Sequence, residues 1–208
     1  MSVHHLIVTY GYLAVLVLVG LESLGVPVPG ETVLIAAGTY AGITHRLSPV
    51  AIVAVAAAGA IVGDTIGYWI GDKGGYRLLR RYGHYVHFDE PKIKVARYLF
   101  AQHGGKVVFF GRFVAVLRTY AAFLAGTTRM RYRRFLVFNA SGGIVWASAY
   151  GFGAYFAGHT LQQLSGKLTI AFVVLAVASV VVAILLIRRQ TARLIAKAEA
   201  AYPGPLEV

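Results

Sequence analysis

The stretch Glu22-Ser-Leu-Gly-Val-Pro-Val-Pro-Gly-Glu31 decides how this chain folds, because it places two carboxylates and several helix-breaking residues inside apolar sequence. A second stretch, Phe110-Gly-Arg-Phe-Val-Ala-Val-Leu-Arg118, places two arginines in equally apolar surroundings. The apolar segments that hold them end near residues 42 and 126 and are too short to cross a bilayer. An ionisable group at membrane depth is costly and by default marks a functional site. We therefore expect the acids of one stretch and the arginines of the other to carry the function.

The composition predicts an integral membrane protein. Of the 208 residues, 58% are hydrophobic and 13% are charged. A soluble domain carries about 25% charged residues. The net charge of +12 is explained by basic cytoplasmic loops, and no nucleic-acid recognition motif accompanies it. The absence of cysteine excludes disulfides, thiolate metal sites and cysteine nucleophiles.

The apolar segments fall into two length classes, because a helix needs about 20 residues to span the hydrocarbon. Three segments are long enough, a fourth nearly so, and two are short. The long ones are residues 49–70, 135–157 and 168–187, the fourth is 6–24, and the short ones are 31–42 and 113–126.

The basic residues predict the orientation of these segments. They concentrate in residues 72–106 and 127–134 and in the tail after residue 187, whereas the loops around Arg46 and Lys167 are poor in them. The positive-inside bias places the first three regions in the cytoplasm, the C-terminus included, and the last two outside. Residues 107–126 then enter and leave the membrane on one side, as a re-entrant hairpin. Irregular backbone at that depth is tolerated only where protein or a wet cavity surrounds it.

A faint internal repeat suggests that the region around Glu22 is a matching hairpin. Ala37-Gly-Thr39 is followed by Gly67-Tyr-Trp-Ile-Gly71, and Ala125-Gly-Thr127 is followed by Ala154-Tyr-Phe-Ala-Gly158. Two interrupted segments in matching positions of an inverted repeat are typical of a transporter site at the repeat interface. The expected fold is an all-α integral membrane protein, an inverted repeat with two re-entrant helical hairpins and about three to four transmembrane helices.

A single membrane domain over residues 1–187 accounts for nearly the whole chain. Residues 72–106 form a cytoplasmic connector within it, and residues 188–208 form a basic cytoplasmic tail. Residues 76–82 and 93–100 read as short amphipathic helices on the membrane surface, with a solvated linker as the alternative.

The acidic residues have two interpretations. Glu22 and Glu31 flank Pro27, Pro29 and Gly30, which free local backbone amides and carbonyls. Each acid is a proton carrier or an arginine partner; the alternative is a carboxylate that caps the helix beginning after Gly30.

Asp64 lies in an apolar helix beside Gly63 and other small residues that permit close helix approach. We expect it to pair with an arginine or to titrate. Asn139, on the helix that follows the second short segment, would hydrogen-bond the hairpin backbone, although packing is the favoured role. Trp146 lies on the same helix as Asn139, and Trp69, Tyr68 and Tyr150 more often anchor or pack than bind a ligand.

Arg112 and Arg118 predict an anion site. The planar guanidinium group stays charged and suits phosphate or carboxylate. The alternative is that both arginines only neutralise the acids.

No catalytic or metal constellation stands out. The histidines lack metal-ligand spacing, and neither a nucleophile elbow nor a phosphate-binding loop occurs. We expect no enzymatic activity, no cofactor and no metal site.

These residues together resemble the DedA family, the bacterial membrane proteins grouped with SNARE-associated and VTT-domain proteins. The resemblance covers residues 6–158. It is carried by Glu22, Pro27, Pro29, Gly30 and Glu31; by Gly63, Asp64, Gly67, Tyr68 and Gly71; by Phe110, Arg112, Phe113 and Arg118; and by Ala125, Gly126, Met130, Phe135, Asn139, Gly143 and Trp146.

The resemblance implies facing re-entrant hairpins and translocation of lipids, notably polyprenyl phosphates such as undecaprenyl phosphate, linked to the proton-motive force across the bacterial plasma membrane. The family's essential acids fall on Glu22 and Glu31, and its essential arginines on Arg112 and Arg118. The chain departs from the family at Ala115, where a proline usually stands between the arginines, and near Leu124. The hairpin tip is therefore expected to turn differently.

The sequence thus favours a flippase whose partners are a phosphate-bearing lipid and protons, without nucleic acid; a homo-oligomer is left open. One alternative is a proton-coupled transporter of a small soluble solute. Another is a membrane-homeostasis factor that does not transport.

Overall fold

The computed structural model describes residues 3–82, 98–100, 102–113 and 115–163, and every regular element in these ranges is helical. Residues 98–100 and 102–103 form short helical pieces. The longer helices are α1 (Val3–Leu24), α2 (Gly30–Thr44), α3 (Pro49–Tyr82), α5 (Lys106–Gly111), α6 (Ala115–Thr127) and α7 (Tyr132–Gln163).

Two helices in the described part of the chain are long and apolar enough to cross a membrane. These stretches are Pro49–Gly74 of α3 and Tyr132–Thr160 of α7. They confirm the predicted apolar helices at residues 49–70 and 135–157, while the segment 168–187 lies outside the described residues. Large apolar side chains point outward from both helices, which suits contact with lipid rather than water. Examples are Val62, Ile66, Val137, Ile144 and Phe156.

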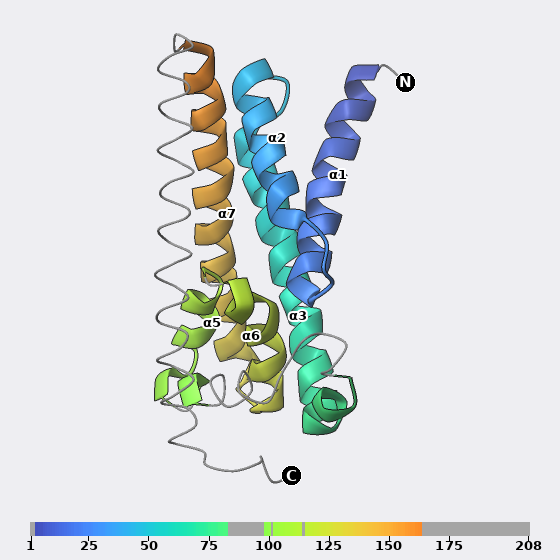
Figure 1. Cartoon of the computed structure of the whole chain (residues 1–208), viewed down its shortest axis with the longest axis vertical. Helices are drawn as coiled ribbons and strands as arrows, with labels where there is room; N and C mark the ends of the chain where they lie inside the picture. Colours follow the sequence, from blue (N-terminus) through green and yellow to red (C-terminus); the bar gives the residue numbers. More distant parts are fainter. Residues whose placement is uncertain (1–2, 83–97, 101, 114, 164–208) are drawn as a thin grey trace.

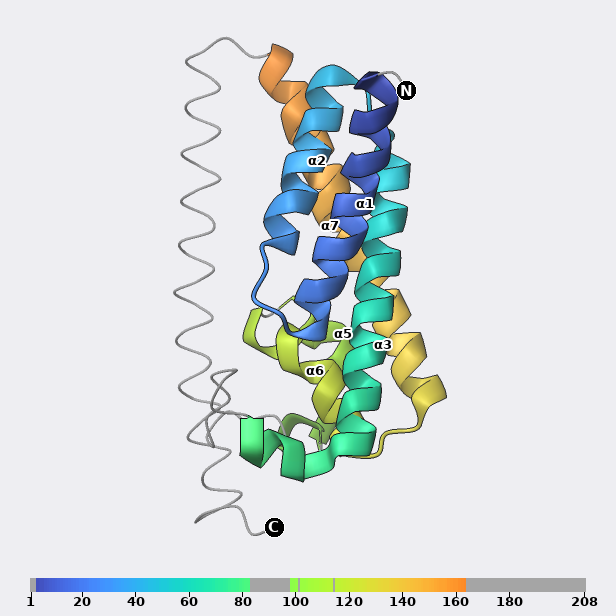
Figure 2. The ribbon, with the colours of Figure 1, turned by 90° about the vertical axis from the view of Figure 1, so that its right-hand side faces the viewer.

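The remaining helices form two hairpins that approach each other from opposite ends of the bundle (Figures 1 and 2). The first hairpin consists of α1 and α2, and the second of α5 and α6. Helix α1 ends at Leu24 because Gly25 adopts a φ of 106°, and the Val26 amide donates to the Leu21 carbonyl at 3.0 Å. This bond is typical of a helix C-terminus closed by glycine. The two hairpin tips face each other at mid-height.

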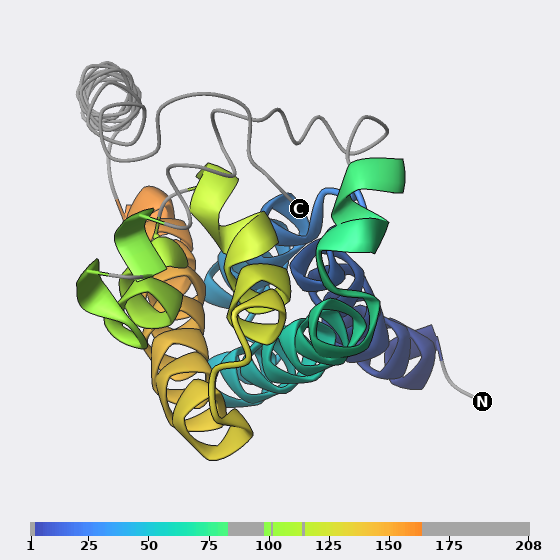
Figure 3. The ribbon, with the colours of Figure 1, turned by 90° about the horizontal axis from the view of Figure 1, so that it is seen from below.

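The helices of the two halves pack crosswise. Helix α1 packs on α3 and α5 packs on α7, whereas α2 packs on α7 and α6 packs on α3. Figure 3 shows α6 against α3 and α5 beside α7. The second helix of each hairpin therefore contacts the long helix of the other half.

Glycines allow these crosswise contacts to be close. A Cβ atom on Gly158 of α7 would lie 2.5 Å from the Thr39 carbonyl oxygen of α2, and one on Gly126 of α6 would overlap the Tyr68 carbonyl of α3. Each short motif of the repeat therefore contacts the long helix of the other half. Ala37-Gly-Thr39 packs on the segment of α7 that ends at Gly158, and Ala125-Gly-Thr127 packs on the segment of α3 that ends at Gly71.

Two apolar cores result, one around each hairpin. The first joins α1 and α2 to α3 and α7 through residues such as Val15, Leu34 and Ile52. The second joins α5 and α6 to the other ends of α3 and α7 through residues such as Val107 and Phe135. The charged residues that the sequence singled out lie between these cores.

The connector begins differently from the prediction. Residues 76–82 are helical as expected, but they are the end of α3 rather than a separate helix, and Figure 2 shows these last turns bending away from the rest of α3. The second predicted connector helix lies mostly outside the described residues, as does the tail.

Candidate functional site

Glu22 lies in the last turn of α1 and caps the helix that follows. Its Oε2 atom accepts a hydrogen bond from the Glu31 amide at 2.7 Å. The first amides of a helix have no partner within that helix, so this carboxylate satisfies one of them. The residue at position 30 must be small, because a Cβ atom there would lie 2.6 Å from Glu22 Oε2. The capping role that the sequence left open for both acids is therefore played by Glu22.

Arg118, in the first turn of α6, joins the two hairpin tips. Its Nη2 atom donates to Glu22 Oε1 at 2.5 Å, and its Nη1 atom donates to Glu31 Oε2 at 2.9 Å. The arginine side chain is 11% exposed, against 19% for Glu22 and 32% for Glu31. Acids from one hairpin thus meet an arginine from the other. We call these three residues, together with Trp146 described next, the Arg118 cluster.

Trp146 of α7 completes this cluster. The guanidinium carbon of Arg118 lies 5.3 Å from the centroid of the Trp146 ring, within cation–π range. Trp146 is 2% exposed, and its ring lies 5.3 Å from that of Tyr150, which is close enough to Glu31 to interact with its charge.

Neither Trp146 nor Tyr150 was predicted as a site residue: Tyr150 was expected to anchor or pack, and Trp146 was noted only among the residues that resemble the family. A signal was present, since positions 139, 143, 146 and 150 follow the spacing of one helical face.

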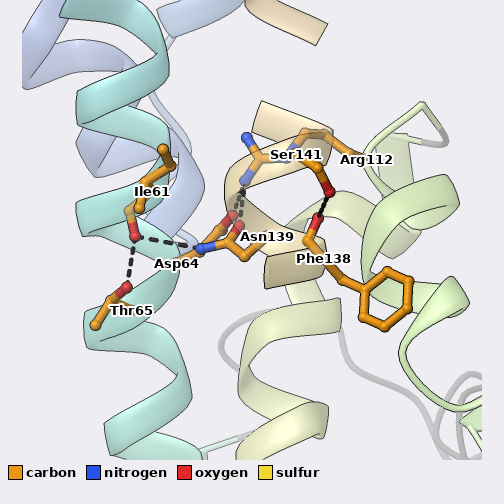
Figure 4. A network of polar contacts seen from close by, with 7 residues as sticks. All are labelled: Ile61, Asp64, Thr65, Arg112, Phe138, Asn139 and Ser141. Carbon is orange, nitrogen blue, oxygen red and sulfur yellow. Dashed lines mark hydrogen bonds and ion pairs between the residues drawn. The ribbon is translucent and has the colours of Figure 1, made fainter. Parts of the chain in front are cut away.

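A second cluster lies deeper in the bundle (Figure 4). Arg112, the residue that ends α5, donates from Nη2 to Asp64 Oδ2 of α3 and, at 2.7 Å, to Asn139 Oδ1 of α7. Asn139 in turn donates from Nδ2 to the Ile61 carbonyl of α3 at 3.3 Å. We call Asp64, Arg112 and Asn139 the Arg112 cluster.

The two clusters differ in burial and charge. The side chains of Arg112 and Asp64 are 3% and 7% exposed, and Asn139 is fully buried. Their charges cancel, whereas Glu22, Glu31 and Arg118 carry one more negative than positive charge when all are ionised. The structure therefore places the two predicted phosphate-binding arginines in different surroundings, with Arg112 beside Asp64 and Arg118 between Glu22 and Glu31.

The other predicted supporting residues shape the backbone around these clusters. Pro27 and Pro29 are exposed in the connection between α1 and α2. Gly63 allows α3 to approach α1, where its Cβ would meet that of Ser23 at 3.0 Å, and Gly126 lies at the contact of α6 with α3.

No group of three or more histidine, aspartate or glutamate residues in the described part of the chain is placed to hold a metal ion. The acids of both clusters are paired with arginines. In the partly exposed Arg118 cluster, such a pair can exchange a carboxylate for another anion or transfer a proton.

The fold and these clusters define a helical membrane protein with acid–arginine pairs between two opposed hairpins. The model of the VTT domain matches residues 28–156, which is more than half of the chain. The chain belongs to the DedA family of VTT-domain proteins.

Relatives support this assignment. An uncharacterized membrane protein of Synechocystis is 43% identical over 157 residues, covering 74% of this chain and 72% of its own. An uncharacterized membrane protein of Mycobacterium tuberculosis is 40% identical over 194 residues, which cover 92% of this chain and 89% of the relative. The protein DedA of Escherichia coli is 33% identical over 161 residues, covering 73% and 69%. No solved structure matches the chain.

Proposed function

We propose that this protein is a flippase that moves a polyprenyl phosphate, such as undecaprenyl phosphate, or a related phospholipid across the bacterial plasma membrane. The observation that carries the proposal is the position of Arg118. It is a cation between two partly exposed carboxylates, at the junction of two hairpin tips inside an apolar bundle. A lipid phosphate needs such a group, because it cannot cross about 30 Å of hydrocarbon unaided.

The proposed topology places Arg118 near the bilayer midplane. Two hairpins that meet tip to tip between long apolar helices fit re-entrant segments from opposite faces of the membrane. The crosswise packing of α2 on α7 and α6 on α3 is what an inverted repeat would produce. In this arrangement the basic segment at residues 127–134 and the C-terminus face the cytoplasm.

In the proposed mechanism, a phosphate replaces a carboxylate on Arg118. Phosphate and carboxylate oxygens accept the same bidentate hydrogen bonds from a guanidinium group. Glu22 and Glu31 are the more exposed acids, so either can leave Arg118 without becoming an unpaired buried charge. The prenyl chain stays in lipid while the phosphate takes the place of the displaced carboxylate on Arg118.

Charge balance supports a link to protons. Glu22, Glu31 and Arg118 already sum to one negative charge, so a bound phosphate would add to an excess of negative charge. Protonation of the displaced carboxylate removes that penalty, and the proton-motive force could then drive exchange in one direction. We propose that the clusters work without covalent chemistry, as a transport site rather than an enzyme's active site.

Reconstitution in liposomes with polyprenyl phosphate, with and without a pH gradient, tests the proposal. Wild type should translocate the lipid, and Arg118→Gln should slow translocation at least about tenfold, since a charge-assisted hydrogen bond contributes about 1.5–3 kcal/mol. The matched control is Arg133→Gln, an exposed arginine at the start of α7. Equal rates for wild type and Arg118→Gln would refute the proposal.

The same assay separates the alternatives. Uptake of a soluble solute without lipid movement would favour a proton-coupled solute transporter. Complementation of a membrane defect in cells by Arg118→Gln, without lipid movement in vitro, would favour a homeostasis factor that does not transport.

A further inference from the structure

We infer that Arg112 is a positioning residue that never contacts the translocated anion, and that the Arg112 cluster is a latch that fixes the second hairpin tip to α3 and α7. The inference rests on the proposed function in one respect, the assignment of Arg118 as the phosphate contact. The inference gives different roles to Arg112 and Arg118, which the sequence pattern predicted to form one anion site.

The latch joins three elements at one guanidinium group. Arg112 ends α5, Asp64 comes from the middle of α3, and Asn139 comes from α7 (Figure 4). Asn139 also binds the Ile61 carbonyl, which accepts a hydrogen bond from Thr65 Oγ1 at 2.7 Å as well. Helices α3 and α7 are thus tied to each other at the point where the hairpin tip is tied to both.

Burial makes Arg112 unsuited to exchange. The side chains of Arg112 and Asp64 are only 3% and 7% exposed. A phosphate that displaced Asp64 would leave a buried carboxylate unpaired, and breaking a buried pair in this way is strongly unfavourable. The side chains of Glu22 and Glu31, the partners of Arg118, are 19% and 32% exposed, so exchange there carries a smaller penalty.

The free nitrogen of Arg112 is also closed off. Nη1 and Asp64 Oδ1 have no hydrogen-bond partner and are sealed from solvent. The guanidinium group lies against α7, where a Cβ atom on Gly143 would be 3.6 Å from Arg112 Cζ and 3.7 Å from Nη1. An anion could reach Nη1 only if α3 and α7 separated.

The latch limits the position of Arg118 because only five residues separate the two arginines in the chain. Arg112 ends α5, and the Phe113 amide closes the turn by donating to the Phe110 carbonyl at 3.1 Å. Helix α6 begins at Ala115, so Arg118 lies in its first turn. With Arg112 held, the first turn of α6 is directed at Glu22 and Glu31.

The experiment compares single and double variants of the latch in the liposome assay. Arg112→Gln and Asp64→Asn should each lower the rate at least about tenfold, because each leaves one buried charge without its partner. The neutral double variant Asp64→Asn/Arg112→Gln keeps an amide pair and should restore the rate to within about threefold of wild type, with an unchanged KM for the lipid. The reversed pair Asp64→Arg/Arg112→Asp is the second test. Thermal unfolding checks that each variant is folded.

Each outcome decides the inference. Rescue by the neutral double variant, with Arg118→Gln still slowed, supports the latch, because this variant has no guanidinium charge in the cluster to hold a phosphate. Rescue by the reversed pair supports it as well, because the ion pair is restored with the guanidinium group on the other helix. Folded double variants as inactive as Arg118→Gln would overturn it and leave the flippase proposal standing. If wild type moves no lipid, the flippase proposal fails, and the unfolding temperatures decide alone: non-additive effects at positions 64 and 112 support the latch, and additive effects overturn it. Failure of both double variants to fold would also overturn it.

Discussion

At the scale of single residues, the guanidinium group of Arg118 contacts two carboxylates and one aromatic ring. Two edges meet carboxylates and one face meets the indole of Trp146. Glu22 divides its two oxygen atoms between Arg118 and the first turn of α2, so this one carboxylate links both hairpins. Substitutions can remove these contacts one at a time.

Glu22→Gln should keep the helix-capping role of this side chain and remove its ion pair with Arg118. The amide oxygen still accepts from the Glu31 amide, but Arg118 loses one competing anion, so we expect tighter binding of lipid phosphate. Binding to wild type should take up a proton, which means that affinity falls as pH rises, by up to about tenfold per pH unit. This pH dependence should weaken in Glu22→Gln. Binding titrations at several pH values measure both effects.

Asp72→Asn is the control for this prediction, because Asp72 is an exposed acid near the end of α3. It should bind with wild-type affinity and pH dependence. A pH dependence in Glu22→Gln that matched the wild-type curve would show that Glu22 is not the displaced acid.

Trp146→Leu should weaken phosphate binding by about 0.5–2 kcal/mol, since Arg118 would lose the aromatic face that holds it while its carboxylate partners leave. Trp146→Phe should weaken phosphate binding less, because an aromatic ring remains beside Arg118. Binding is measured on folded protein, since Trp146 also fills the first core. Trp69→Leu is the control, as Trp69 is 42% exposed and packs on Tyr132. Equal losses in the Leu variants of Trp146 and Trp69 would contradict the prediction.

At the scale of helices, the contacts of α2 with α7 and of α6 with α3 depend on backbone approaching backbone. Glycine is needed there because any Cβ would strike a carbonyl group of the facing helix. Without a hydrophobic force between helices in lipid, close packing of this kind is a main source of association.

Gly158→Ala should therefore destabilise the fold by about 1–3 kcal/mol, the usual cost of overpacking. Its Cβ would lie 2.5 Å from the Thr39 carbonyl oxygen. Gly153→Ala on the same helix has no atom within 4 Å of the new Cβ and should be neutral or slightly stabilising, because alanine favours helix. Thermal unfolding in detergent compares the two variants. A larger loss in Gly153→Ala would contradict this account of the contact.

At the scale of the whole molecule, two small cores and two opposed hairpins leave the charged clusters at their common boundary. Neither hairpin holds a complete site: the first provides Glu22 and Glu31, the second provides both arginines, and the long helix α3 provides Asp64. Long helices α3 and α7 belong to both cores, so a movement of one hairpin relative to them would change the contact between the tips.

The proposed topology predicts which loops share a side of the membrane. The chain has no native cysteine, so Arg46→Cys, Lys106→Cys and Arg133→Cys each give a unique label, and all three positions are exposed. An impermeant maleimide should reach the cysteines at positions 106 and 133 from one side and that at position 46 from the other. Reaction of positions 106 and 133 from opposite sides would show that the α5–α6 segment crosses the membrane.

Sequence alone determined the membrane class, the family, the two long apolar helices and the residues that carry charge into the bundle. These follow from local properties: hydrophobic length, helix breakers and the cost of an ion in lipid. The crosswise pairing of the two glycine motifs could not be predicted from their repetition, since a repeat does not tell which copy each helix contacts.

Tertiary structure decided the pairing of the charges. Arg112 and Arg118 are alike by composition and lie in the same apolar stretch, and only the fold makes one fully buried with Asp64 and Asn139 and the other partly exposed between Glu22 and Glu31. The same holds for Trp146 and Tyr150 of α7. Only the fold brings Trp146 to Arg118 of α6 and Tyr150 near Glu31 of α2. The physical reason is that burial and partner choice are set by how helices from both halves meet.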